Sequence, residues 1–181
     1  HQEQSRSQRK HGAIMTTRES IRINAEKVSE IFNTGKFTLA IAESFTGGNV
    51  VASLVAIPGA SSFISEGLTC YSNESKRVRL GVKAETLDKF GAVSENTVLE
   101  MINGLLASPL KPDFAVATTG NAGPGTEPLS VPGECYVAAG SRNDITVKRL
   151  SLSGGREENI LDGTNEALVN LIKFVKNQRG E

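Results

Sequence analysis

The chain has 181 residues, of which 38% are hydrophobic, enough to build the core of one domain. Its 20 basic and 20 acidic residues leave no net charge, and no apolar run approaches the roughly 20 residues of a membrane helix, so neither nucleic acid nor a membrane is an expected partner. The two cysteines, Cys70 and Cys135, lie in separate apolar segments, which favours buried free thiols of a reducing, cytoplasmic compartment over a disulfide.

The segment 1–14 is polar and precedes any hydrophobic periodicity. We expect a disordered tail here, be it a cloning remnant, a truncated native extension or a processed targeting segment, ahead of a domain at 15–181. Both histidines, His1 and His11, lie in this segment. The domain is therefore expected to lack the imidazole of Ser-His-Asp catalysis and of histidine-based metal sites, and a base working near neutral pH must be a Lys, Glu, Asp or Tyr with a shifted pKa.

The first half of the domain alternates helical and extended patterns. Apolar residues at helical spacing predict a helix over residues 20–33 that ends near Gly35, and residues 38–42 form a short apolar run typical of a buried strand. The elements predicted next are a helix at 48–56 with Val50, Val51, Leu54 and Val55 facing inward, a strand at 67–71, and helices at 73–80, at 85–90 and after the N-cap Ser94.

The second half begins with a predicted buried strand at 114–118. Residues 120–133 contain too many glycines and prolines for regular structure, which predicts a long loop of the kind that often carries function. The alternating stretches 134–139 and 145–152 indicate a β-hairpin, and a helix follows at 157–176. These elements predict an α/β fold: a single three-layer α/β/α domain around a mixed, mostly parallel sheet with one β-hairpin.

Ser44 lies at a predicted strand–turn–helix junction. Such a turn places its hydroxyl beside unpaired backbone N–H groups, where an anion or a developing oxyanion is stabilised. Ser44 is therefore a candidate nucleophile or phosphate-binding residue, and the structural alternative is a helix N-cap worth about 1 kcal/mol. Gly47 and Gly48 favour a ligand site because they let a ligand approach the backbone closely.

Lys76 is the candidate base. With Asn73 as the N-cap, Lys76 falls at the third helical position, where the helix dipole and partial burial favour the neutral amine. A neutral lysine near a serine activates the hydroxyl without a histidine. The alternative is a solvated lysine beside Arg77, and Tyr71, at a strand end, is equally compatible with a packing role.

Two further segments carry polar groups to predicted loops. Thr118 and Thr119 end a strand just before the glycine-rich loop, and the carboxyl ends of parallel strands commonly form a ligand crevice. Arg156 follows two glycines ahead of the last helix, where it is placed to bind a phosphate or carboxylate or to remain a surface arginine.

Five motifs, in this order, resemble those of the CinA C-terminal domain family, also called the PncC-type nicotinamide-nucleotide amidases. The likeness covers about residues 28–175. The matching segments are 42–48 (A-E-S-F-T-G-G, for the family's A-E-S-C/A-T-G-G), 58–61 (P-G-A-S), 71–76 (Y-S-N-E-S-K, for Y-S-N-E-x-K), 91–95 (G-A-V-S-E) and 119–124 (T-G-N-A-G-P, for T-G-x-A-G-P).

The resemblance implies an amidohydrolase that converts nicotinamide mononucleotide and water to nicotinate mononucleotide and ammonia, without a metal or organic cofactor. It implies that Ser44 is the nucleophile, Lys76 its base and Tyr71 a partner in proton handling, with Thr119 a further active-site residue. Substrate contacts are expected from Thr46, Gly47, Gly48, Asn73, Gly120 and Arg156, with Arg156 near the phosphate and N–H groups near Thr46 and Gly47 holding the oxyanion. The expected partners are a small-molecule nucleotide and further copies of the chain in a homo-oligomer.

Three positions depart from the family pattern. Phe45 stands where a small residue is usual, the loop at 125–133 is shorter and less glycine-rich, and Ile160 replaces a second arginine found in many relatives. These departures keep two alternatives open: a catalytically idle nucleotide- or phosphate-binding module, and an oligomeric regulatory partner.

Overall fold

The structure, a computed structural model, describes residues 15–125 and 127–181. The expected disordered tail at 1–14, with both histidines, lies outside the described residues. The assignment of 15–181 to one domain therefore stays a prediction.

Five strands form one sheet in the order β2-β1-β3-β4-β5. Strand β1 (Leu39–Glu43) pairs in parallel with β2 (Ile64–Thr69) and with β3 (Phe114–Gly120). Strand β4 (Glu134–Gly140) is antiparallel both to β3 and to β5 (Ile145–Ser151), with which it forms the predicted hairpin. Because only β4 runs against the others, the prediction of a mixed, mostly parallel sheet is confirmed.

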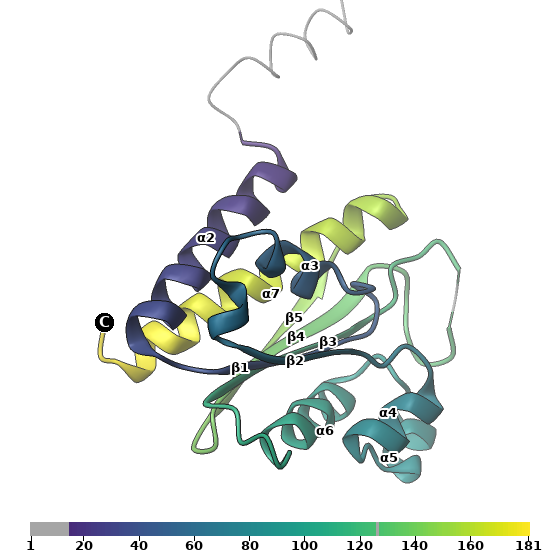
Figure 1. Cartoon of the computed structure of the whole chain (residues 1–181). Helices are drawn as coiled ribbons and strands as arrows, with labels where there is room; N and C mark the ends of the chain where they lie inside the picture. The colour runs from purple at the N-terminus through teal and green to yellow at the C-terminus, as the bar shows by residue number, and fades with distance from the viewer. Residues whose placement is uncertain (1–14, 126) are drawn as a thin grey trace, which may run out of the picture.

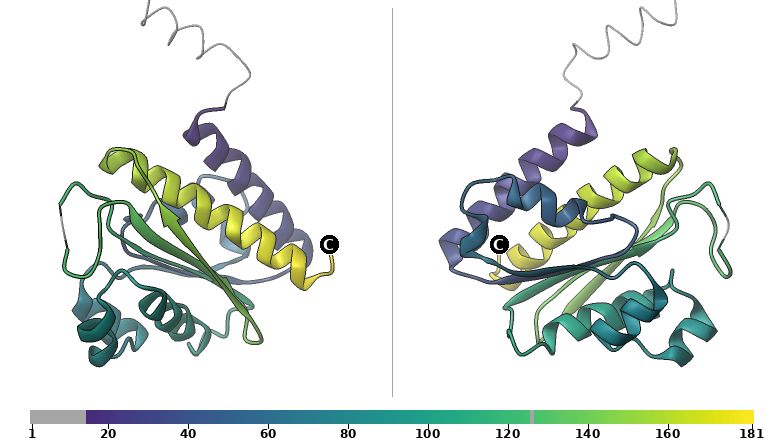
Figure 2. Two further views of the ribbon diagram at one scale, coloured as in Figure 1. Left: turned by 180° about the vertical axis from the view of Figure 1, so that it is seen from behind. Right: turned by 45° about the vertical axis from the view of Figure 1, so that its right-hand side comes forward.

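Helices cover both faces of the sheet, which confirms the predicted three layers (Figures 1 and 2). One face carries α2 (Thr17–Gly35), α3 (Asn49–Val55) and α7 (Arg156–Gln178). The other carries α4 (Asn73–Leu80), α5 (Ala84–Phe90) and α6 (Glu95–Leu106), and a short 3-10 helix, η1 (Ala60–Ser62), precedes β2.

Each face of the sheet has its own apolar core because side chains along a strand alternate between the two faces. Leu39 and Ile41 of β1 join the core beneath α2 and α7, whereas Ala40 and Ala42 join the core beneath α6. On the α6 face the strands contribute mostly alanines and the helix contributes large side chains such as Met101, so the helix packs closely on the sheet. Both cysteines are buried and free, as predicted.

The predicted elements are all present, with corrections at their ends and on one helix face. Helix α2 ends with Lys36 in the left-handed conformation (φ 56°), one residue beyond Gly35. Strand β2 begins three residues earlier than predicted, and β3 continues through Gly120 into the predicted loop. Val55 was predicted to face inward and is 59% exposed, because the short helix α3 buries only one narrow side.

Candidate active site

The turn after β1 is built around a buried carboxylate. Glu43 is fully buried, and its carboxylate accepts hydrogen bonds from the Thr46 hydroxyl (2.6 Å) and from the backbone N–H groups of Val50 (2.9 Å) and Val51 (3.1 Å). Helix α3 has Gly48 as its N-cap and no side-chain cap of its own. Glu43 therefore supplies the acceptors that the first turn of this helix needs.

A directed chain of hydrogen bonds ties this turn to β3. The Thr46 hydroxyl donates to Glu43, so its oxygen accepts from the Thr118 hydroxyl 2.9 Å away. The Thr118 oxygen in turn accepts from the backbone N–H of Ser44 at 3.2 Å. The ends of β1 and β3 are thereby held together beneath Ser44.

Lys76 reaches Ser44 from helix α4. Its Nζ atom lies 2.9 Å from Ser44 Oγ and donates to the backbone carbonyls of Cys70 (3.0 Å) and Tyr71 (3.1 Å). The N-cap of α4 is Ser72 rather than the predicted Asn73, so Lys76 occupies the fourth helical position. The structure thus brings together the two side chains that the sequence named as nucleophile and base.

Burial is the main cause of the electrostatic state of Lys76. The residue is 1% exposed, and this loss of hydration lowers the pKa of its amine from the usual 10.5, while the charges of Cys70 and Glu127 act in the opposite sense. The side chain is thus almost completely buried, whereas the sequence argument expected partial burial. No carboxylate of residues 15–125 or 127–181 lies within 4.0 Å of Nζ.

Ser44 and Lys76 line a pocket of about 100 Å³ at the carboxyl ends of β1 and β3. We call these two residues and the three that support Ser44 through hydrogen bonds, all of them buried, the pocket base: Glu43, Ser44, Thr46, Lys76 and Thr118. The lining also includes Phe45, Ala92, Val93, Thr119, Gly120, Asn121, Ala122 and four exposed residues. One of these is Asn73, and we call the other three, Tyr71, Glu127 and Arg156, the pocket rim.

The rim is held by the side chain of Arg156, which begins helix α7. Its guanidinium donates to the carbonyl of Gly123 at 2.7 Å and to the Tyr71 hydroxyl at 3.2 Å. No hydrogen bond within the described part of the chain joins the Tyr71 hydroxyl to Ser44 or Lys76. The predicted role of Tyr71 in proton handling therefore rests on its place in the lining alone.

The predicted site residues separate into two groups. Ser44, Lys76, Tyr71, Thr119, Asn73, Gly120 and Arg156 all line the pocket. Thr46, Gly47 and Gly48 do not: Thr46 is fully buried in the hydrogen-bond chain, and the Gly47 N–H donates to the carbonyl of Ser44 at 3.0 Å. The Gly47 N–H is therefore already occupied and is a poor candidate for the oxyanion donor that we expected.

Thr119 has a specific partner across the pocket. Its hydroxyl donates to the carbonyl of Ala92 at 2.6 Å, which ties the end of β3 to the segment between α5 and α6. The G-A-V-S-E motif contributes Ala92 and Val93 to the lining. This contact explains why two motifs far apart in the sequence meet at one site.

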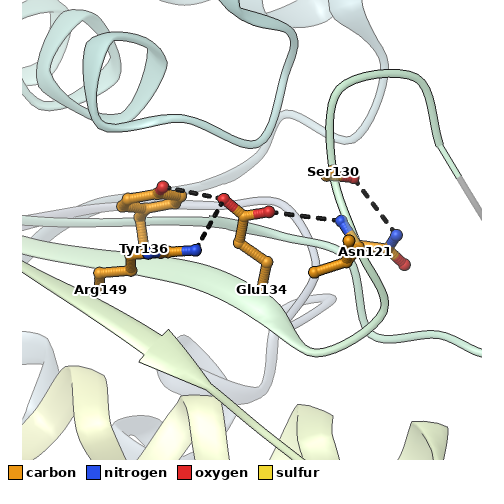
Figure 3. A network of polar contacts seen from close by, with 6 residues as sticks. Asn121, Ser130, Glu134, Tyr136 and Arg149 are labelled. Carbon is orange, nitrogen blue, oxygen red and sulfur yellow. Dashed lines mark hydrogen bonds and ion pairs between the residues drawn. The ribbon is translucent and has the colours of Figure 1, made fainter.

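Sequence reasoning missed the polar residues that shape the loop after β3. Asn121 accepts from the Gly123 N–H at 3.0 Å. It also donates to the Ser130 hydroxyl at 3.3 Å (Figure 3). Beside it, Glu134 accepts from the Tyr136 hydroxyl at 3.0 Å, and burial raises the pKa of that tyrosine. The asparagine in the middle of the T-G-N-A-G-P motif was the available signal that a side chain holds this loop by hydrogen bonds.

Phe45 lines the pocket, and its ring packs against helix α7. Its ring is 5% exposed and belongs to the core beneath α7. A Cβ atom on Gly163 of α7 would overlap this ring, and one on Gly120 would lie 2.9 Å from it. A helical glycine thus provides the space for the bulky residue that follows Ser44, although glycine costs about 1 kcal/mol relative to alanine inside a helix.

Within the ranges 15–125 and 127–181, no three His, Cys, Asp or Glu side chains gather as a metal site would require. Among the helices of those ranges, none is both long and apolar enough to cross a bilayer.

The fold and the buried serine–lysine pair define a three-layer α/β protein with a polar pocket at the strand ends. The model of the CinA C-terminal domain matches residues 22–175, and the chain belongs to that family.

Relatives of known sequence and structure agree with this assignment. The chain is 40% identical over 151 residues to a CinA-like protein of Fusobacterium nucleatum and 41% identical over 163 residues to one of Thermotoga neapolitana. These matches cover 82% and 87% of this chain but only 36% and 39% of the relatives, so the chain spans little more than a third of their length. A crystal structure of the competence/damage inducible protein CihA from Agrobacterium tumefaciens is 36% identical with a TM-score of 0.80, and the match covers 85% of this chain and 94% of that one.

Proposed function

We propose that the chain is an amidohydrolase that deamidates nicotinamide mononucleotide to nicotinate mononucleotide and ammonia, with Ser44 as nucleophile and Lys76 as general base. The substrate comes from the family resemblance. The reaction type is supported by the geometry of the pocket base, and one observation carries it: the position of Lys76 Nζ between Ser44 Oγ and two carbonyl oxygens.

The hydrogen-bonding capacity of a neutral amine explains why this position matters. A neutral amine has two N–H groups and one lone pair. The carbonyls of Cys70 and Tyr71 can only accept, so they take the two N–H groups. The lone pair then faces Ser44, whose hydroxyl is the donor at 2.9 Å. This is the arrangement in which an amine removes the proton from a hydroxyl nucleophile.

Acylation follows from this arrangement. Ser44 Oγ attacks the carboxamide carbon while its proton moves to Lys76 Nζ, giving a tetrahedral intermediate and an ammonium group. The N–H group of Phe45, a residue of the pocket lining, is used by no hydrogen bond inside the described ranges and is the proposed donor to the oxyanion. The C–N bond then breaks, and Lys76 returns the proton to the nitrogen, which leaves as ammonia.

Deacylation uses the same amine. Lys76, again neutral, takes a proton from water as the water oxygen attacks the ester carbon. The bond to Ser44 Oγ breaks, the proton returns to that oxygen, and the carboxylic acid product leaves. Atoms and protons balance with water as the only co-reactant.

The size of the pocket suggests how the substrate lies. Its volume of about 100 Å³ is below that of pockets that enclose a drug-sized ligand, so it suits only the carboxamide-bearing ring. A second hollow of about 260 Å³ adjoins it and shares Ala122 and Arg156. We place the ribose phosphate toward this second hollow, with Arg156 between the two.

The proposal is tested by incubating the purified protein with nicotinamide mononucleotide and measuring ammonia and nicotinate mononucleotide. Ser44→Ala is expected to abolish turnover with the circular dichroism spectrum unchanged, and Ser53→Ala, at a half-buried serine of α3 outside the pocket lining, is the matched control. Ammonia release near the wild-type rate by Ser44→Ala would refute the serine mechanism. Saturable binding without ammonia release by the unmodified protein would instead support the idle binding module.

A further inference from the structure

The pocket rim carries two opposite charges that do not neutralise each other. Glu127 and Arg156 both line the pocket and are exposed. No ion pair of the described residues includes either side chain. The guanidinium of Arg156 donates one hydrogen bond to Gly123 and one to Tyr71. These contacts fix the guanidinium and leave further N–H donors for an anion.

Glu127 places a carboxylate in the lining of the same pocket as Ser44 and Lys76. Its negative charge raises the pKa of Lys76, although burial lowers that pKa by more. Within the described ranges the side chain accepts no hydrogen bond, and only its backbone carbonyl is used, by the Ser130 N–H. A positive group bound next to Ser44 would therefore meet an uncompensated negative charge.

Tyr71 adds a second feature that suits a cation. Its side chain is 60% exposed at the rim, and its hydroxyl is held by Arg156. An aromatic face attracts a cation placed over it. The pocket lining thus includes both an aromatic ring and a carboxylate, and Arg156 lines this pocket and the second hollow.

We infer that Glu127 is a specificity-determining residue: its carboxylate selects substrates in which the ring bearing the carboxamide is positively charged, as Arg156 selects an anion at the other end. The preferred ligand is a zwitterion, and this inference rests on the proposed function, because nicotinamide mononucleotide has a cationic pyridinium ring and an anionic phosphate.

The test compares two ligands of the same shape and different ring charge: nicotinamide mononucleotide and its uncharged analogue, in which a carbon-linked benzamide replaces the pyridinium. Their dissociation constants are measured by calorimetry on Ser44→Ala, so that chemistry does not contribute. Adding Glu127→Gln is expected to weaken binding of the cationic ligand by about fivefold, the scale of a solvent-exposed charge pair, and to change the uncharged ligand by less than about twofold.

Two further variants separate charge from loop structure. Glu127→Asp keeps the charge and is expected to retain most of the preference, and Glu85→Gln, an exposed acid outside the pocket lining, is expected to change neither ligand. The inference is overturned if Glu127→Gln weakens both ligands equally or neither. If Ser44→Ala binds neither ligand, the proposed function itself fails. If it binds both ligands but Glu127→Gln does not discriminate between them, only this inference fails.

Discussion

The pocket base and the pocket rim use polar groups in opposite ways. In the base, Lys76 and the Glu43 carboxylate are buried, and each donor or acceptor has a partner within the protein. At the rim, Glu127 and Arg156 are exposed and keep capacity for a ligand. Burial changes protonation and fixes geometry, whereas exposed charges act weakly and are screened by salt. We therefore expect changes in the base to affect chemistry strongly and changes at the rim to affect recognition moderately.

The largest expected effect comes from Lys76→Met, which would test whether the base carries the chemistry. Removing a general base typically costs about a hundredfold to ten-thousandfold in rate, so kcat should fall by that amount with KM little changed. Steady-state ammonia release measures both constants. The control is Lys173→Met, at an exposed lysine of α7. Activity retained by Lys76→Met would show that the base does not carry the chemistry.

The pH dependence of the unmodified protein gives a second signature of Lys76. Since burial lowers its pKa from 10.5, the rate should rise with pH as the amine loses its proton. Between the lowered pKa and 10.5 the unfolded chain binds more protons at this position, so the contribution of Lys76 to the unfolding free energy increases with pH over that window. Denaturant unfolding at several pH values measures this increase, which Lys76→Met should abolish and Lys173→Met should retain.

The next effect concerns the rim. Arg156→Ala removes a guanidinium proposed to bind the phosphate, and the loss of a charge-assisted hydrogen bond of about 1.5–3 kcal/mol should raise KM about tenfold to a hundredfold with kcat nearly unchanged. Arg156→Lys keeps the charge but not the forked geometry, so its KM should lie between those of the unmodified protein and Arg156→Ala. A fall in kcat with unchanged KM would show that the rim takes part in the chemistry. The assignment of chemistry to the base and recognition to the rim would then be wrong.

The sequence predicted the parts of this molecule that local patterns determine. The apolar run before Glu43 and the glycine pair after Thr46 placed Ser44 in a strand–turn–helix junction, and the bounds of α4 were predicted correctly because Gly81 ends it in the left-handed conformation. The prediction that Val55 faces inward was wrong because apolar residues lie on more than one side of α3, whereas this short helix buries only Val50 and Leu54.

The site was predictable as a set of candidates but not as an arrangement. Ser44 and Lys76 are 32 positions apart, and Tyr71 and Arg156 are 85 apart, so no local periodicity relates them. Only the order of several motifs, which resembles a known family, joined them in advance. Glu127 was missed because it lies in an irregular loop, where side-chain direction follows no repeat.

A smaller effect tests how Phe45, the residue that follows Ser44, is packed against α7. Gly163→Ala would place a methyl group where the Phe45 ring lies, and overpacking of this kind costs about 1–3 kcal/mol in unfolding free energy. Urea unfolding measures the loss. Combining it with Phe45→Ala should make the cost of the Gly163 change much smaller, because the clash is gone. Gly155→Ala, at a position with open space, is the control, and an equal cost for both glycine changes would refute the contact.

The smallest expected effect concerns the hydrogen-bond chain beneath Ser44. Thr118→Val keeps the shape of the side chain and removes the hydroxyl, which leaves the Ser44 N–H without its acceptor and Thr46 without a donor. If the chain positions Ser44 for attack, kcat should fall about fivefold to tenfold with KM unchanged, and Thr118→Ser, which retains the hydroxyl, should restore most of the rate. A purely structural role would lower the unfolding free energy in Thr118→Val without changing kcat of the folded enzyme. That outcome would separate two roles within the base. Ser44 and Lys76 would be the reacting pair, and the hydrogen-bonded residues Glu43, Thr46 and Thr118 would only stabilise the fold.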